Sequence, residues 1–181
     1  FKILNDTLGH QMGDQLLKKV GQRLSASVRK TDLVARLGGD EFVVMADDLS
    51  NDPAAAAHKA RVLAEKVLNT LREPFQLTGH QHFATPSIGV TIFHGTQADV
   101  GDLLKQADVA LYQANERTAG ATVFYTHSLL KDLQTDDELN HFLAASPTHL
   151  ALIASDSEPA PPLKVLKQMM VGRQAYYFVG Q

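Results

Sequence analysis

The sequence has no cysteine, no strong excess of charge of one sign and no long apolar run. Without cysteine it has neither disulfides nor thiolate metal ligands, which fits a cytoplasmic protein. A formal net charge of −3 lacks the basic surplus typical of proteins that bind nucleic acids. No apolar run approaches the length that spans a membrane, and no signal peptide opens the chain. We therefore expect neither a nucleic-acid partner nor a membrane segment in these residues.

What the sequence does contain is enough apolar material for one core. A chain of 181 residues with 44% hydrophobic residues can bury one good core plus an appendage. The first residue is Phe1 rather than methionine, and it falls inside a motif described below. We therefore expect the chain to be a piece of a longer protein.

Helical and strand patterns alternate along the first two thirds of the chain. Apolar periodicity, turn residues and a proline at a helix start predict the following elements: helices over 14–29, 53–72 and 99–117, a hairpin of strands 32–37 and 42–46, a second hairpin of strands 75–78 and 83–93 turned by Gly79-His80-Gln81, and a closing strand over 121–126. Helices interleaved with hairpins predict an α/β (α+β) layer, in which an antiparallel-rich central sheet is covered by helices.

The first hairpin carries the most informative residues of the chain. Two glycines, Gly38 and Gly39, are followed at once by two carboxylates, Asp40 and Glu41, between apolar strands. Glycine lets a turn adopt positive φ and lets a phosphate lie against backbone N–H groups. Carboxylates beside a phosphate suit Mg²⁺. On these residues alone, an ordinary Gly-Gly hairpin with two solvated acids is an equally good interpretation.

A polar stretch at the start of the chain favours the functional interpretation. Residues 1–14 read FKILNDTLGHQMGD and precede an amphipathic helix. This stretch resembles the FK-x-(I/L)-ND-x-x-GH-x-x-GD signature of GGDEF domains, the diguanylate cyclases of bacterial signalling. The resemblance extends to about Thr126 and includes the hairpin, a strand over 87–91 and a helix over 107–114. It implies a palm-like, ferredoxin-related nucleotidyl cyclase fold with the Gly-Gly-Asp-Glu-Phe hairpin at one edge.

The resemblance implies a reaction between two GTP molecules. Each of two facing domains holds one GTP, and cyclic di-GMP forms with release of two pyrophosphates. Positioning and charge neutralisation drive such phosphoryl transfers, so few residues are needed. Asp40 and Glu41 are the implied ligands of Mg²⁺ or Mn²⁺, and Asp40 is the implied proton acceptor. Glu41 completes the metal shell or orients Lys2, which reaches the phosphates.

The same resemblance implies a set of substrate-binding residues. Asn5 and Asp14 correspond to residues that read the guanine edge, a role suited to an amide and a carboxylate. Gly38 and Gly39 offer backbone to the phosphates. His10 is an equally good candidate for substrate binding and for a purely local hydrogen-bonding role.

A regulatory motif precedes the hairpin. Arg29-Lys30-Thr31-Asp32 followed by five residues and Gly38 matches the RxxD site of the family, at which a cyclic di-GMP dimer inhibits the enzyme. Arginine forks bind phosphate and guanine edges in a bidentate way. Arg36 is a further candidate for this allosteric inhibitory site. The alternative is a charged helix end followed by a strand.

Two positions depart from the family pattern. The family places an Asp-x-Asp metal ligand on a strand just before Phe-Lys, so we expect that strand, and a helix ahead of it, to lie outside this chain. The Lys and Arg that contact the terminal phosphate are replaced by Asn115 and Ala119, with Arg117 two residues away. We therefore expect the chain alone to be weak or inactive as a cyclase. Two alternatives stay open: a degenerate domain that binds cyclic di-GMP or GTP, and an interaction domain that only dimerises or couples its neighbours.

The remaining residues predict less. We divide the chain into a GGDEF domain over 1–126, a connecting amphipathic helix over 127–146, and a linker and unassigned tail over 147–181. His80 and His82 flank a hairpin tip without a third ligand, so they predict no metal site. The resemblance implies a homodimer, and sensory and EAL domains in a longer, cytoplasmic or membrane-tethered parent chain.

Overall fold

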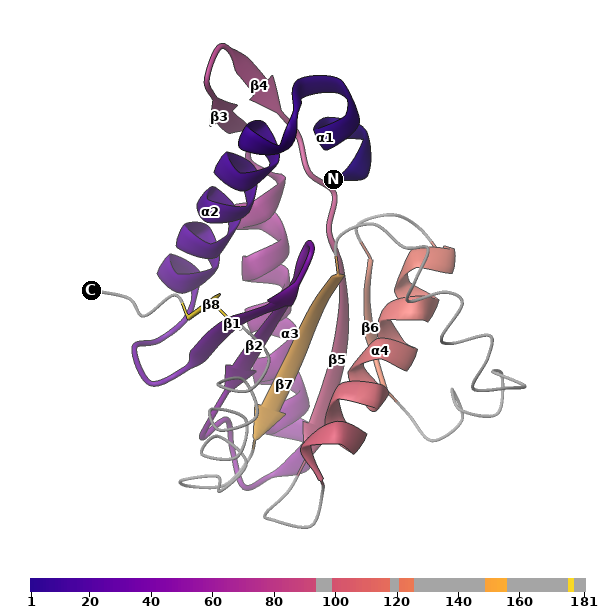
Figure 1. Ribbon diagram of the computed structural model, residues 1–181. Coiled ribbons are helices and arrows are strands. Elements are labelled where there is room, and N and C mark those ends of the chain that lie inside the picture. The colour runs from indigo at the N-terminus through magenta and orange to yellow at the C-terminus, as the bar shows by residue number, and fades with distance from the viewer. Residues whose placement is uncertain (94–98, 118–120, 126–148, 156–175, 178–181) are drawn as a thin grey trace.

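The computed structural model describes residues 1–93, 99–117, 121–125, 149–155 and 176–177. Two helices come first, and groups of strands are then separated by single helices, as the labels in Figure 1 show. In chain order they are α1 (Lys2–Leu8), α2 (His10–Ser27), β1 (Leu33–Gly38), β2 (Glu41–Ala46), α3 (Pro53–Arg72), β3 (Phe75–Leu77), β4 (His80–His82), β5 (Ser87–Phe93), α4 (Val100–Arg117), β6 (Thr122–Phe124), β7 (His149–Ser155) and β8 (Tyr176–Tyr177).

One sheet organises the described residues. Its strand order is β6-β5-β7-β2-β1-β8, and β3 and β4 form a separate two-stranded sheet. β1 runs antiparallel to both β2 and β8, whereas β7 runs parallel to β2 and β5, and β6 runs parallel to β5. Figure 1 shows β7 as the orange strand in the middle of the sheet. In the sequence, its neighbour β2 precedes it by about a hundred residues and its neighbour β5 by about sixty.

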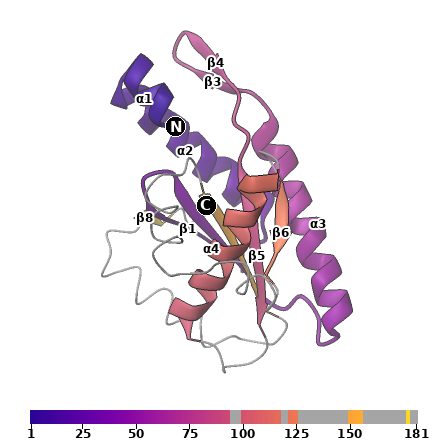
Figure 2. The same ribbon diagram turned by 90° about the vertical axis from the view of Figure 1, so that its right-hand side faces the viewer.

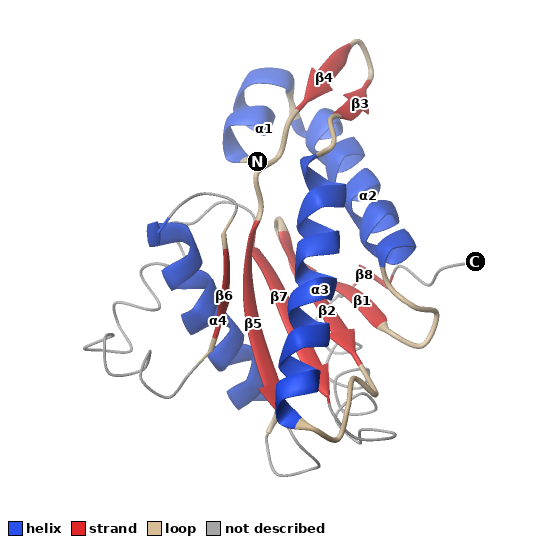
Figure 3. Cartoon of the chain, turned by 180° about the vertical axis from the view of Figure 1, so that it is seen from behind, coloured by secondary structure: helices blue, strands red, loops and turns tan. Residues whose placement is uncertain are grey.

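Helices cover both faces of this sheet, as the side view of Figure 2 and the rear view of Figure 3 show. Alternate residues of β2 separate the two cores, because neighbouring side chains on a strand point to opposite faces. Phe42 and Val44 pack in the cluster that contains the buried residues of α2 and α3. Val43 and Met45 pack with Val100, Leu103 and Ala107 of α4 on the other face. The sheet is therefore the middle layer of three.

Helix α3 begins and ends as its sequence predicts. The Asp52 carboxylate accepts a hydrogen bond from the Ala55 backbone N–H at 2.7 Å, and Pro53 occupies the first turn. Ala56, Ala60 and Ala64 are fully buried, at a spacing of four residues. Their small side chains let the helix lie close to the sheet.

Arg23 ties the end of α3 to α2. Its guanidinium donates to the carbonyl oxygens of Thr70 (3.2 Å), Glu73 and Pro74 (2.6 Å), and it lies 3.8 Å from the centre of the Phe75 ring. The carbonyl groups at a helix C-terminus lack partners within the helix. A single planar side chain therefore satisfies them and fixes the strand that follows.

The helix-and-strand class and the helix over 53–72 are confirmed, and three details of the prediction are wrong. Residues 2–8 form α1, although the polar motif there predicted no helix. The strand expected over 83–93 is divided: β4 ends at His82, and β5 begins at Ser87 in the other sheet. Pro86 lies between them and has no backbone N–H to donate to a ladder.

The third detail concerns the sheet and the tail. Residues 149–155, expected in a linker and unassigned tail, form β7 at the centre of the sheet, and their parallel pairing makes the sheet less antiparallel than expected. The expected helix over 128–145 lies outside the described residues. Within the part of the chain that the structure describes, no helix combines the length and the apolar character needed to cross a bilayer.

Candidate functional site

The tip of the β1–β2 hairpin is held in one conformation. Gly39 has a φ of 47°, in the left-handed region that glycine tolerates best. The Arg36 Nε donates to the Gly39 carbonyl oxygen at 2.8 Å, and Gly38 pairs with Glu41 across a register shift. Both glycines are exposed, so their backbone is open to a ligand. Arg36, predicted as part of the inhibitory site, thus contacts the hairpin turn.

Three carboxylates gather beside this turn. Burial raises the pKa of Glu41, and the neighbouring charge of Asp40 raises it further. Asp108, on α4, has its pKa raised to about 7, first by burial and then by the charge of Glu41. Carboxylates that disfavour one another's ionised form gain from a nearby cation. The sequence motif pointed to Asp40 and Glu41; it gave no role to Asp108, because the topology brings α4 to the hairpin from 67 positions further along.

Asp40 also borders a cavity of about 490 Å³. Phe1 and Leu4, at the start of α1, also line it, together with Leu16 and Leu17 of α2. Asp40 therefore shares this cavity with residues at the corner between α1 and α2, although the predicted guanine-reading residues Asn5 and Asp14 do not line it. A cavity of this size, mostly apolar with a few polar groups, is typical of small-molecule sites.

Asn5 lies at that corner with an unsatisfied group. Its Oδ1 is buried and has no hydrogen-bond partner among the described residues. A Cβ added at Gly13 would lie 1.9 Å from this oxygen, so only glycine leaves room for the Asn5 amide over α2. Buried polar groups without partners are rare and call for an explanation. A ligand that donates a hydrogen bond to Asn5 would supply one.

The other predicted substrate contacts are exposed around the same corner. Lys2 lies in the first turn of α1, and His10 and Asp14 lie in the first two turns of α2. None of these three side chains lines the cavity beside Asp40. The structure thus places Asp40 and the α1–α2 corner at one cavity and leaves Lys2, His10 and Asp14 on the surface.

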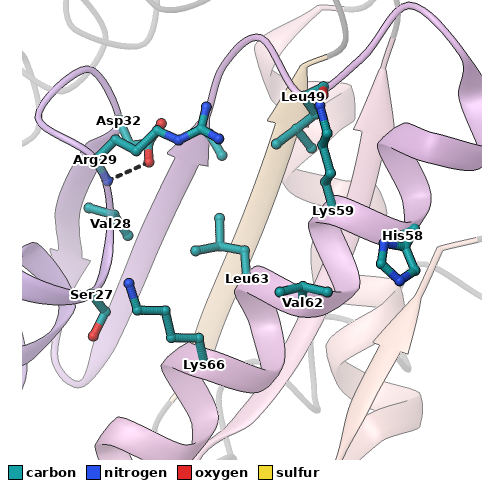
Figure 4. A pocket seen from close by; sticks show the side chains of 11 residues that line it. Ser27, Val28, Arg29, Asp32, Leu49, His58, Lys59, Val62, Leu63 and Lys66 are labelled. Carbon is teal, nitrogen blue, oxygen red and sulfur yellow. Dashed lines mark hydrogen bonds between the residues drawn. The ribbon is translucent and has the colours of Figure 1, made fainter.

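A second cavity, of about 390 Å³, lies between the segment that leads into β1 and helix α3 (Figure 4). Arg29 and Asp32 both line it. The Arg29 backbone N–H donates to Asp32 Oδ2 at 2.7 Å, which shapes the RxxD segment into a tight turn. Asp32 Oδ1 is buried and has no partner among the described residues. The predicted inhibitory residues therefore share a cavity and keep one acceptor for a ligand.

Helix α3 adds basic side chains that the motif did not reveal. His58, Lys59 and Lys66 line the same cavity, and Figure 4 shows Lys66 extending toward the segment that carries Val28. The Lys59 Nζ donates to the Leu49 carbonyl oxygen. His58 and Lys59 are adjacent on α3, and Lys66 follows Lys59 by seven positions. The pattern of basic residues along one face of the helix is the sequence signal that could have identified them.

Metal ligation by protein groups alone finds no support in the described part of the chain. No three His, Cys, Asp or Glu side chains there are grouped so that they could hold a metal ion. Two carboxylates with substrate phosphates are nevertheless the usual Mg²⁺ environment. In this structure the charge of Asp40 acts on Glu41, and the charge of Glu41 acts on Asp108. Ala119 and the side chains of Asn115 and Arg117, the departures from the family pattern, lie outside what the structure describes.

Comparison with known proteins decides the family. The sequence pattern described as "Diguanylate cyclase, GGDEF domain" matches residues 1–120. This chain belongs to the GGDEF domain family. Three relatives from Pseudomonas aeruginosa illustrate the range of GGDEF-containing proteins: the cyclic di-GMP phosphodiesterase NbdA (37% identity over 79% of this chain and 18% of NbdA), the bifunctional diguanylate cyclase/cyclic di-GMP phosphodiesterase MucR (36%, 79% and 20%) and the diguanylate cyclase TpbB (30%, 81% and 33%).

Solved structures agree with this GGDEF assignment. The GGDEF domain of TpbB (YfiN) from Pseudomonas aeruginosa superimposes with a TM-score of 0.59 at 31% identity, over 74% of this chain and 76% of that one. An EAL/GGDEF domain protein from M. capsulatus gives a TM-score of 0.53 at 30% identity, over 69% and 77%. The palm-like nucleotidyl cyclase fold is thereby confirmed. This GGDEF chain spans between 18% and 33% of the length of the three curated relatives named above.

Proposed function

We propose that this GGDEF chain contributes one half of a diguanylate cyclase that condenses two GTP into cyclic di-GMP. The observation that carries the proposal is the hairpin tip, where Asp40 lies between a bare Gly-Gly backbone and the cavity at the α1–α2 corner. Two copies of the domain face each other, each with one GTP. The GGDEF domains of relatives named as cyclases support this assignment.

The bond changes define what the residues must do. The 3′-hydroxyl oxygen of one GTP attacks the α-phosphorus of the other, an O3′–P bond forms, and the bond to pyrophosphate breaks. Asp40 takes the hydroxyl proton, and pyrophosphate leaves with the bond electrons. The same exchange in the opposite direction closes the ring. In-line phosphoryl transfer depends on position and charge more than on covalent help.

Each side chain has one task in this scheme. Asp40 and Glu41 hold Mg²⁺ or Mn²⁺, which neutralises phosphate charge when bound. Lys2 contacts the phosphates, and the Gly38 and Gly39 backbone lets them approach. The guanine edge is read by Asn5 and Asp14, with His10 at the same corner. The unsatisfied Asn5 oxygen accepts a hydrogen bond from the base in this arrangement.

A titration of the intact chain tests this proposal. Isothermal titration calorimetry with a non-hydrolysable GTP analogue should show Mg²⁺-dependent binding, weakened at least tenfold in Asp40→Asn. Glu65→Gln, on the exposed face of α3, is the matched control and should bind as the unmodified chain does. Analogue binding that survives Asp40→Asn and ignores Mg²⁺ would contradict the role of the hairpin. Cyclic di-GMP formation from GTP, followed by chromatography, measures turnover separately.

A second function is favoured by the cavity at the start of β1. A GGDEF domain without the usual phosphate contacts can act as a cyclic di-GMP receptor, and Arg29, Asp32 and the free Asp32 acceptor suit a cyclic dinucleotide. In an active cyclase the same site would give product inhibition. Cyclic di-GMP binding that is lost in Arg29→Ala, in a chain that does not bind the GTP analogue, would favour the receptor over the enzyme.

A further inference from the structure

The cavity between the segment that leads into β1 and helix α3 has a positively charged rim. Among the described residues that line it, Arg29, Lys59 and Lys66 stand against the single carboxylate of Asp32. All three cationic side chains are exposed, so a soluble anion can reach them. The chain as a whole carries a formal net charge of −3. Positive charge is therefore concentrated at this cavity, where it attracts ligands of opposite sign.

The wall inside this rim is apolar. Leu49 is buried and Leu63 is half-buried, whereas Val62 is 50% exposed, and all three line the cavity. Figure 4 shows Val62 and Leu63 side by side on α3. An apolar wall packs against a flat and weakly polar group such as a nucleobase, while the charged rim binds phosphate. The cavity therefore suits a ligand that joins these two groups, as a nucleotide does.

The protein itself fixes the position of the Lys59 ammonium group. Its Nζ donates to the carbonyl oxygen of Leu49, in the connection between β2 and α3 (Figure 4). An ammonium group has three N–H donors, and a carbonyl accepts one of them without neutralising the charge. The lysine side chain is thus ordered before a ligand arrives, so binding does not have to order it. The Lys59 ammonium is therefore arranged to bind an anion.

We propose that Lys59 binds a phosphate group of the dinucleotide in this cavity, together with Arg29, and that it selects ligands by that phosphate. This inference rests on the proposed cyclic di-GMP site and adds a residue from outside the RxxD motif. The charges agree, because cyclic di-GMP carries two phosphodiester anions and the lining cations exceed the carboxylate by two. A bound phosphate would also be linked through Lys59 to the connection that follows β2.

Calorimetric titration of the intact chain with cyclic di-GMP tests the role of Lys59. Lys59→Met removes the charge and keeps an apolar stem, and we expect the affinity to fall at least about fivefold because a charge-assisted hydrogen bond is lost. Lys59→Arg keeps a cation and should stay within about twofold of the unmodified chain. Lys18→Met, exposed on α2 and outside both cavities, is the matched control and should bind as the unmodified chain does.

Salt dependence separates a charge contact from a structural effect. Salt screens exposed charges, so the unmodified chain should lose affinity between about 50 mM and about 500 mM NaCl. Lys59→Met should lose less, and Lys18→Met should lose as much as the unmodified chain. Urea unfolding measures what the bond to Leu49 contributes to stability. Lys59→Gln keeps an N–H donor but no charge, and it repeats the test should Lys59→Met be unstable.

The outcomes distinguish this inference from the function on which it rests. If Arg29→Ala abolishes cyclic di-GMP binding while Lys59→Met keeps its affinity and salt dependence, the cavity binds the dinucleotide without Lys59 and the inference is wrong. Equal losses of affinity in Lys59→Met and Lys59→Arg would also contradict it, because the bond to Leu49 rather than the charge would then matter. If the unmodified chain does not bind cyclic di-GMP, the receptor function and the inference are both wrong.

Discussion

At the scale of single residues, the most exacting contact is that between Asn5 and Gly13. The Asn5 amide occupies the space where any other residue at position 13 would place its Cβ. Helical glycine costs about 1 kcal/mol relative to alanine, so its presence within α2 needs a reason. The reason offered by the structure is room for the Asn5 side chain, which the proposed function assigns to guanine.

Gly13→Ala should therefore separate stability from binding. The clash falls on the flexible end of Asn5, and alanine favours the helix, so we expect the free energy of unfolding to change by less than about 1 kcal/mol. Displacement of Asn5 should weaken binding of the GTP analogue at least tenfold. Urea unfolding and calorimetric titration measure the two effects.

A double variant controls this prediction. If Gly13→Ala acts only through Asn5, then Asn5→Ala/Gly13→Ala should bind no more weakly than Asn5→Ala alone. Fully additive losses of affinity would mean that Gly13 contributes in some other way.

The Asp108 carboxyl predicts a dependence of stability on pH. Its pKa in the folded protein is about 7, above the ordinary value of 3.8, because of burial and then the charge of Glu41. The folded state therefore holds the proton more tightly than the unfolded state does. Below about pH 4 this carboxyl does not lower the free energy of unfolding. It lowers that free energy progressively as the pH rises, and by the full amount above pH 7.

Asp108→Asn should remove that cost. In buffer with EDTA, we expect the variant to gain stability relative to the unmodified chain between pH 4.5 and pH 8, at about 1.4 kcal/mol for each pH unit at most. Chemical denaturation at four pH values measures the gain. Glu65→Gln, exposed on α3, is the control and should show no such trend. A constant difference across this pH range would refute the effect of burial.

At the scale of elements, α4 and β5 lie so close together that their backbones meet at Gly89. A Cβ at Gly89 would lie 2.1 Å from the Ala107 carbonyl oxygen and 2.6 Å from the Leu111 backbone nitrogen. Thr91, two residues on, donates to the Gln106 side chain at 2.7 Å. Backbone therefore meets backbone at this point, and the helix cannot move aside without losing its buried face.

Gly89→Ala should destabilise the protein by about 3 kcal/mol, the upper part of the range for overpacked cores. Thermal and urea unfolding measure the loss. Gly38→Ala is the control, because a Cβ there meets no atom within 4 Å and should change the stability far less. Equal losses of stability in the two variants would show that replacing glycine by alanine is itself destabilising, whether or not α4 lies close to the added methyl group.

The elements differ in how far the sequence alone could predict them. Helix α3 was predicted with its observed bounds, because a cap, a proline and a repeating apolar face are local signals. Helix α1 was missed because it buries only Leu4, so its sequence lacks an apolar stripe. The strand over 83–93 was extended too far, since apolar alternation does not report a change of sheet.

The candidate site shows the same division. Gly38, Gly39, Asp40 and Glu41 are consecutive, so their proximity follows from one turn. Asp108 joins them only through the packing of α4, and no local pattern contains that information. Lys59 and Lys66 of α3 likewise reach the cavity of Arg29 and Asp32 only through the packing of the helix. The RxxD motif therefore identified only some of the residues that line this cavity.

At the scale of the whole molecule, β7 determines whether the described sheet is continuous. Ala151 pairs with Val43 on one side and with Gly89 on the other. Proline at a central position removes a ladder hydrogen bond and does not fit between two neighbours. A defect there should therefore affect both halves of the sheet.

Ala151→Pro should lower the free energy of unfolding by about 3 kcal/mol or more. Hydrogen exchange measured by mass spectrometry should show faster exchange in both β2 and β5. Ala151→Gly keeps the backbone N–H and is the matched control, with an expected loss of about 1 kcal/mol. Unchanged protection of both strands in Ala151→Pro would argue against a structural role for β7.

The late position of β7 also has a consequence for synthesis. A ribosome makes β2 and β5 long before the strand that lies between them, and at roughly 5–20 residues per second the wait lasts several seconds. Until β7 is made, the ladder pairs that it forms with β2 and β5 are missing. Contacts between segments so far apart give a high contact order, which slows folding. Chaperone demand and inclusion-body formation should therefore depend on how quickly translation reaches residue 155.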